Sequence, residues 1–91
     1  MADLLAVGHE NYLALDRIVA VAPPGAAPLK RATQSAKEHD RLIDLTSGRR
    51  TKAVIVLEDG WVALVAITPE TIASRTQALR APRASAPAPT L

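Results

Sequence analysis

The sequence predicts an α+β protein with a small, mostly antiparallel sheet, a central hairpin and two helices. Two segments rich in β-branched residues, 51–57 and 61–67, flank an Asp-Gly pair that is typical of a hairpin turn. Two other segments, from 27 and from 69, have the proline positions and apolar spacing of helices. A chain of 91 residues and 9.6 kDa has room for one small domain.

The first third of the chain predicts two strands. Residues 4–7 form a short apolar segment, and residues 13–22 alternate in part between apolar and polar positions. Pro23 and Pro24 end the second strand, because proline supplies no backbone N–H to a sheet.

The middle of the chain predicts a helix followed by a short strand. The helix covers about residues 27–40 with Pro28 in its first turn, where proline is tolerated. Residues 42–45 are a further extended segment, which Ser47-Gly48 ends. A narrow apolar stripe runs along the helix at Leu29, Ala32 and Ala36.

The hairpin joins 51–57 to 61–67 through Glu58-Asp59-Gly60. Asp-Gly favours a two-residue type I′ loop, which would pair Val56 with Ala63. Both faces of such a hairpin are mostly apolar, whereas an antiparallel sheet usually leaves one face to water. We expect the chain's own helices to cover one face and a neighbouring subunit to cover the other.

The second helix begins at Thr68-Pro69-Glu70, with threonine as N-cap, proline in the first turn and an acid at the positive end of the helix dipole. We expect one folded domain over residues 1–80. Residues 81–91 are rich in alanine and proline and are expected to be a disordered tail.

The composition favours a homo-oligomer. There is no phenylalanine, and we expect the single tryptophan and tyrosine, Trp61 and Tyr12, in the core. With so few large side chains the hydrophobic core would be small, and no cysteine is present to stabilise it through a disulfide. Association of several copies of the chain is the remaining common way to stabilise so small a domain. Lack of cysteine, of a basic leader and of a long apolar run favours a cytoplasmic protein with no membrane partner.

The net charge of +2 is unevenly distributed along the chain. Residues 26–52 carry seven bases and three acids, while 1–25 and 53–79 are each net negative. A basic middle third indicates an anionic partner that is met by one surface.

The segment Gly48-Arg49-Arg50-Thr51-Lys52, the arginine loop, is the main candidate site. Its guanidinium forks, backbone N–H groups and hydroxyl suit phosphate oxygens. The alternative is a merely solvated basic turn. Because adjacent strand residues point to opposite faces, the two arginines serve one surface only if the backbone is irregular here.

Lys30 and Arg31 are the second candidate. They lie in the first turn of the expected helix, where the dipole disfavours a cation by about 0.3–1 kcal/mol. Binding to an anion would explain them, and pairing with a nearby acid is the alternative. Lys37 and Arg41 are expected to face solvent.

Catalysis has little support. His9 and His39 have neither a cysteine to activate nor metal-ligand spacing, so we interpret both as ordinary surface histidines. We therefore expect no catalytic residues, metal, cofactor or small-molecule substrate. The scarcity of aromatic residues argues against single-stranded DNA or RNA, whose bases stack on such side chains, and favours double-stranded DNA held by its phosphates.

Residues 42–54, LIDLTSGRRTKAV, resemble the signature segment of the RemA family of small bacterial DNA-binding regulators. The resemblance covers about residues 4–77. The chain departs from the family at two positions. Family members often have a glycine where this chain has Glu10, and an aromatic residue where it has Ser47. Further matches are Gly8, Asn11, Asp16-Arg17, Pro28, Lys30-Arg31, Pro69-Glu70-Thr71 and Arg75.

The resemblance implies a cytoplasmic, ring-shaped homo-oligomer that binds promoter DNA in the nucleoid and regulates transcription. It also implies that Arg17, Arg49 and Arg50 contact DNA. The alternative hypothesis is an oligomeric scaffold whose basic loop docks an acidic protein partner, and competition with a polyanion would separate the two. The full set of expected DNA-binding residues is Arg17, Lys30, Arg31, Arg49, Arg50, Thr51 and Lys52.

Overall fold

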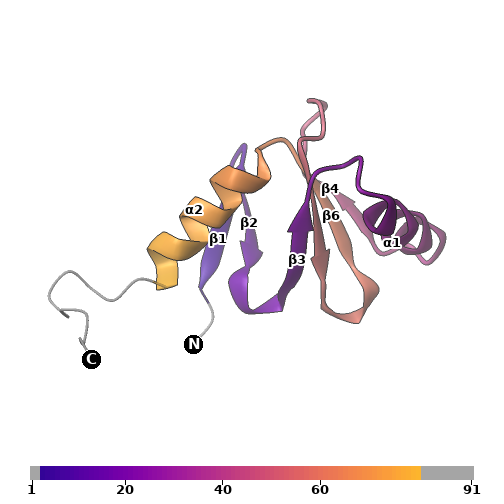
Figure 1. The fold of residues 1–91 in the computed structure, drawn as a ribbon, viewed down its shortest axis with the longest axis horizontal. Coiled ribbons are helices and arrows are strands. Elements are labelled where there is room, and N and C mark those ends of the chain that lie inside the picture. The colour runs from indigo at the N-terminus through magenta and orange to yellow at the C-terminus, as the bar shows by residue number, and fades with distance from the viewer. Residues whose placement is uncertain (1–2, 81–91) are drawn as a thin grey trace, which may run out of the picture.

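A computed structural model describes residues 3–80 of the chain, so the expectation of a disordered tail at 81–91 lies outside the described residues. Figure 1 shows the arrangement of the elements. They are, in order, β1 (Leu4–Gly8), β2 (Asn11–Ala14), a 3₁₀ turn η1 (Leu15–Arg17), β3 (Ile18–Ala22), α1 (Ala27–Glu38), β4 (Leu42–Asp44), β5 (Ala53–Leu57), a 3₁₀ turn η2 (Glu58–Gly60), β6 (Val62–Val65) and α2 (Pro69–Arg80).

The fold is α+β with two helices, as the sequence predicts. Strands β1 and β2 pair antiparallel in a sheet of their own. The other sheet has the order β3-β5-β6-β4, in which only the β4–β6 pair is parallel. The central β5–β6 hairpin and the mostly antiparallel pairing are therefore confirmed.

The prediction of one continuous strand over 13–22 is wrong. Turn η1 interrupts it and sends β2 and β3 into different sheets. The reason is Leu15, which is buried in the core, while its N–H donates to the carbonyl of Asp3 at 2.8 Å. The chain must turn at this point to bury Leu15 and leave the neighbouring charges of Asp16 and Arg17 in water.

The predicted register of the hairpin is wrong by one residue. Val56 lies opposite Val62, and the N–H of Leu57 donates to the carbonyl of Trp61 at 2.8 Å. The loop therefore has three residues, and both Asp59 and Gly60 have positive φ angles, 64° and 79°. Three-residue loops with a left-handed residue are a common alternative to the two-residue turn.

The chain covers both apolar faces of the hairpin itself, so the expectation that one face needs a neighbouring subunit is wrong. Figure 1 shows α1 on one side of the four-stranded sheet and β1, β2 and α2 on the other. On the first side Ala36 of α1 packs against Val54 and Val62. On the other side Ile55 and Val65 pack in one cluster with Leu5, Val7, Leu15 and Ile72.

Trp61 and Tyr12 are not core residues, contrary to expectation. Trp61 is 38% exposed because it follows the hairpin loop rather than lying within a strand. Tyr12 is 59% exposed and lines a surface hollow with Leu4 and Leu79. Aliphatic side chains such as Leu5, Ile55 and Ile72 fill the core instead of aromatic ones.

Both predicted helices are confirmed, with α1 ending two residues earlier than expected. Asp40 has a positive φ of 57°, which stops the helix. Thr68 caps α2, since its Oγ1 accepts a hydrogen bond from the N–H of Thr71 at 3.2 Å. A guanidinium nitrogen of Arg75 in α2 donates to the carbonyl of Ala6 at 2.9 Å and ties the helix to β1.

Candidate nucleic-acid interface

Asp44, the last residue of β4, holds the base of the arginine loop. Its Oδ1 accepts hydrogen bonds from the hydroxyl of Thr46 at 2.6 Å and from the N–H of Thr46 at 2.9 Å. Thr46 is 3% exposed, the one polar side chain buried among the described residues. Both hydrogen bonds lower the pKa of the Asp44 carboxyl, because they stabilise its charged form. The bond from the Thr46 hydroxyl has the larger effect, and the bond from the Thr46 N–H has the smaller one. The ionised carboxylate therefore fixes the start of the loop.

The backbone turns sharply just before the two arginines. The N–H of Arg49 donates to the carbonyl of Thr46 at 3.0 Å, and Ser47 and Gly48 between them have φ angles of 55° and 80°. Two central residues with positive φ define a type I′ turn. The N–H of Lys52 then rejoins the sheet by donating to the carbonyl of Val65 at 2.9 Å. The irregular backbone that the sequence requires at this point is therefore present.

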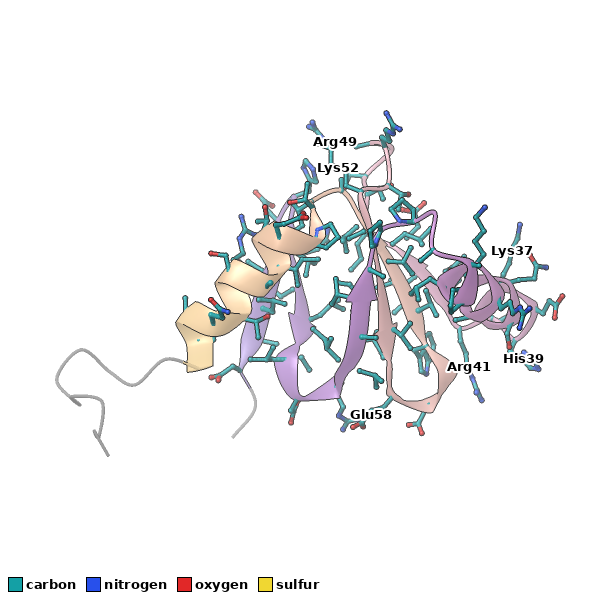
Figure 2. All side chains as sticks on the ribbon, in the orientation of Figure 1. Lys37, His39, Arg41, Arg49, Lys52 and Glu58 are labelled. Atoms are coloured by element: carbon teal, nitrogen blue, oxygen red, sulfur yellow. The ribbon has the colours of Figure 1, made fainter. Side chains whose placement is uncertain are left out.

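The turn brings Arg49, Arg50 and Lys52 to one surface hollow, which His9 and Ala66 complete. We call this site the cationic hollow. Figure 2 shows Arg49 and Lys52 at the end of the molecule where the β4–β5 connection projects beyond the sheet. All three cations are exposed, and none has a carboxylate within ion-pair distance among the side chains that the structure describes. Their charge is therefore available to an external anion.

His9 reaches the hollow from the β1–β2 turn, some 40 residues away along the chain. The side-chain amide of Asn11 donates to the carbonyl of Leu45 at 3.3 Å and joins this turn to the end of β4. Gly8 lies so close to Ile67 that an added Cβ would come within 3.1 Å of its Cγ2. Sequence reasoning interpreted His9 as an ordinary surface residue, since its neighbours in the hollow are distant in sequence.

Lys30 and Thr51 lie together in a second hollow, with Thr33 and Gln34 of α1 in its wall. Thr51 belongs to the arginine loop, so the start of α1 stands beside that loop. Lys30 and Arg31 are both exposed, and neither pairs with an acid among the described side chains. Arg31 lines neither hollow.

Lys37 and Arg41 face solvent, as predicted, near the other end of α1 (Figure 2). A guanidinium nitrogen of Arg41 donates to the carbonyl of Asp59 at 3.0 Å and holds the hairpin loop.

Arg17 lies at the opposite end of the sheet from the arginine loop. Its guanidinium is 4.0 Å from the carboxylate of Glu58, and both side chains are more than half exposed. Figure 2 places Glu58 at the far end of the molecule from Arg49 and Lys52. The six residue steps of nearly extended chain from Lys52 to Glu58 span about 20 Å. One subunit therefore does not bring Arg17 and the arginine loop to the same small surface.

Residues 3–80 contain no cluster of three or more histidine and carboxylate side chains placed to hold a metal ion. Within the same range, no helix has the length and apolar character that a membrane crossing needs. The arrangement at the cationic hollow is one of exposed donors and positive charge, which suits the binding of an anion.

Two comparisons with known proteins identify the family of the chain. The family described as RemA-like, extracellular matrix regulatory protein A-like, matches residues 4–76. Proteins of Bacillus cereus and Bacillus anthracis, each named "Putative regulatory protein", are 51% identical to the chain over 71 residues. A relative in Bacillus cytotoxicus has the same identity, and the matched region is 78% of this chain and 82% of that relative. The match spans every strand, all of α1 and most of α2, so the chain belongs to the RemA-like family.

Proposed function

We propose that this protein is a transcriptional regulator that binds double-stranded DNA as a homo-oligomer, with the arginine loop on the phosphate backbone. A regulatory role is supported by the family description and by the names of the relatives. The observation that carries the DNA-binding part is the cationic hollow. Arg49, Arg50 and Lys52 converge there without a carboxylate partner among the described side chains.

The base of the loop is rigid, which favours binding. The buried hydroxyl of Thr46 and the ionised Asp44 fix the turn before any ligand arrives. A backbone turn that is already formed loses less conformational entropy when its arginines bind a phosphate oxygen. Lys30 and Thr51 extend the donor surface toward α1.

Duplex DNA fits this surface better than a single strand does. Neither hollow at this end is lined by phenylalanine, tyrosine or tryptophan. Trp61 instead lies with Arg17 in a hollow at the opposite end, and Tyr12 lies beside α2. Binding to a duplex through its phosphates needs no platform for base stacking.

Assembly would supply the affinity that one loop lacks. Each subunit offers a few phosphate contacts, and repeating them around a ring raises the total affinity through multivalency. Strand β3 has an outer edge that pairs with no other strand of residues 3–80, and Val19 on it is 65% exposed. It borders an apolar hollow of about 590 Å³ that Leu15, Ile18 and Ile72 help to line, and a second copy of the chain would cover this surface.

Binding of the purified full-length chain to a mixed-sequence duplex, measured by fluorescence anisotropy over a series of salt concentrations, tests the proposal. We expect a linear fall of log affinity with log salt concentration. Mapping of chromatin-bound sites in the source cell would then show discrete occupied sites in the nucleoid. Absence of duplex binding even at low salt would contradict the proposal. A protein partner that is retained at salt concentrations and polyanion levels that remove DNA would favour an oligomeric scaffold instead.

A further inference from the structure

We infer that His9 is a fourth phosphate-binding side chain of the cationic hollow, and that its protonation makes DNA binding depend on pH. The inference rests on the proposed function, and it adds a residue that lies outside the arginine loop. His9 lines the same hollow as Arg49, Arg50 and Lys52, with Ala66 as the apolar part of the lining.

The β1–β2 turn presents the imidazole at the tip of the sheet. Gly8, His9 and Glu10 have consecutive positive φ angles of 101°, 55° and 66°. Left-handed conformations at non-glycine residues cost free energy and concentrate at functional sites. The contacts of Asn11 with Leu45 and of Gly8 with Ile67 fix this turn against the β4 and β6 ends. The imidazole is exposed, so a ligand in the hollow can reach it.

The charges that face His9 are nearly all positive. Arg49, Arg50 and Lys52 line the same hollow from the β4–β5 connection, and Glu10 follows His9 on its own turn. The two other acids near this end, Asp44 and Glu70, do not line the hollow. Asp44 accepts the hydrogen bonds of Thr46, and Glu70 at the start of α2 lines the apolar hollow beside β3.

A phosphate of DNA bound in the hollow would give the imidazolium an anionic hydrogen-bond acceptor, so DNA binding favours the protonated form of His9. Binding that takes up a proton is stronger at low pH than at high pH, within the range where histidine changes charge.

The experiment compares duplex-DNA affinity at about pH 6 and about pH 8, at one fixed salt concentration, in the full-length protein. The parent chain is expected to bind about twofold more tightly at the lower pH for each engaged subunit, as one exposed ion pair contributes. His9→Asn should lose this difference and bind at both pH values as the parent does at the higher one. Asparagine tolerates a positive φ, so this variant keeps the turn.

Two further variants separate charge from structure. His39→Asn is the matched control, because His39 lies at the far end of α1 and its Nδ1 contacts the carbonyl of Ser35. It should keep the pH dependence of the parent. His9→Lys, which carries a permanent charge, should bind tightly at both pH values, a rescue that a purely structural role of His9 would not give.

The outcomes distinguish this inference from the proposed function. If Arg49→Ala and Arg50→Ala weaken DNA binding while His9→Asn keeps the full pH dependence of the parent, the inference about His9 is overturned and the proposed function stands. If the arginine variants bind DNA like the parent, the proposed site and the inference fail together. Loss of the pH dependence in His9→Asn alone, with rescue in His9→Lys, supports the inference.

Discussion

Replacing either arginine of the cationic hollow by alanine should weaken duplex-DNA binding without disturbing the fold. Both side chains are exposed, and neither contributes to the buried clusters. Neither residue has the positive φ that Ser47 and Gly48 adopt, so alanine fits the backbone at both positions. Melting temperature and oligomer mass should therefore stay at the values of the parent protein.

The size of the loss follows from the exposure of the two side chains. A single exposed charge pair contributes about 0.5 kcal/mol. If about three subunits of a ring contact one duplex, the same substitution removes about 1.5 kcal/mol, which weakens binding roughly tenfold. The salt dependence gives an independent measure, since the slope of log affinity against log salt should become shallower by about 0.9 for each phosphate that the variant no longer neutralises.

Anisotropy titrations of a mixed-sequence duplex at several salt concentrations measure both quantities. Lys37→Ala is the control, because Lys37 is also an exposed cation and lies on α1, away from the arginine loop (Figure 2). It should leave the slope nearly unchanged. Affinities and slopes for Arg49→Ala and Arg50→Ala equal to those of the parent would refute the reasoning and place the DNA-binding surface elsewhere.

Three other predictions concern assembly, pH and the tail. Val19→Asp puts a charge on the exposed β3 edge, and we expect it to reduce the mass measured by light scattering toward 9.6 kDa. The circular dichroism spectrum should stay unchanged. An oligomer of unaltered mass would show that the interface does not include this edge. Because Thr46 lowers the pKa of Asp44, the stability that this pair contributes is present above the unfolded-state pKa of about 3.9 and is lost as pH falls through the folded-state value. Thr46→Val should therefore lower the melting temperature near neutral pH, and the melting temperature of this variant should fall less than that of the parent as the pH is lowered. The same fall in both proteins would contradict this role of Thr46. Deleting residues 82–91 should leave assembly and melting temperature nearly unchanged, because the segment offers few large apolar side chains to pack; a large drop in melting temperature would show otherwise.

Local signals in the sequence determined most of the secondary structure. The Thr68-Pro69 start of α2, Pro28 in the first turn of α1 and the β-branched segments of the hairpin act on their immediate neighbours, so a single sequence carries them. The arginine loop was also predictable, because its five residues are contiguous and a glycine precedes the charges.

Tertiary packing decided what depends on distant residues. The burial of Leu15 broke the 13–22 segment into two strands, and the three-residue loop moved the hairpin register by one position. Three further features depend on how the elements pack in space. One chain covers both faces of the sheet, Arg17 lies at the far end from the arginine loop, and His9 lines the same hollow as Arg49. Such contacts join residues tens of positions apart, and the free energy that selects them comes from burial of the whole core, which no local pattern encodes.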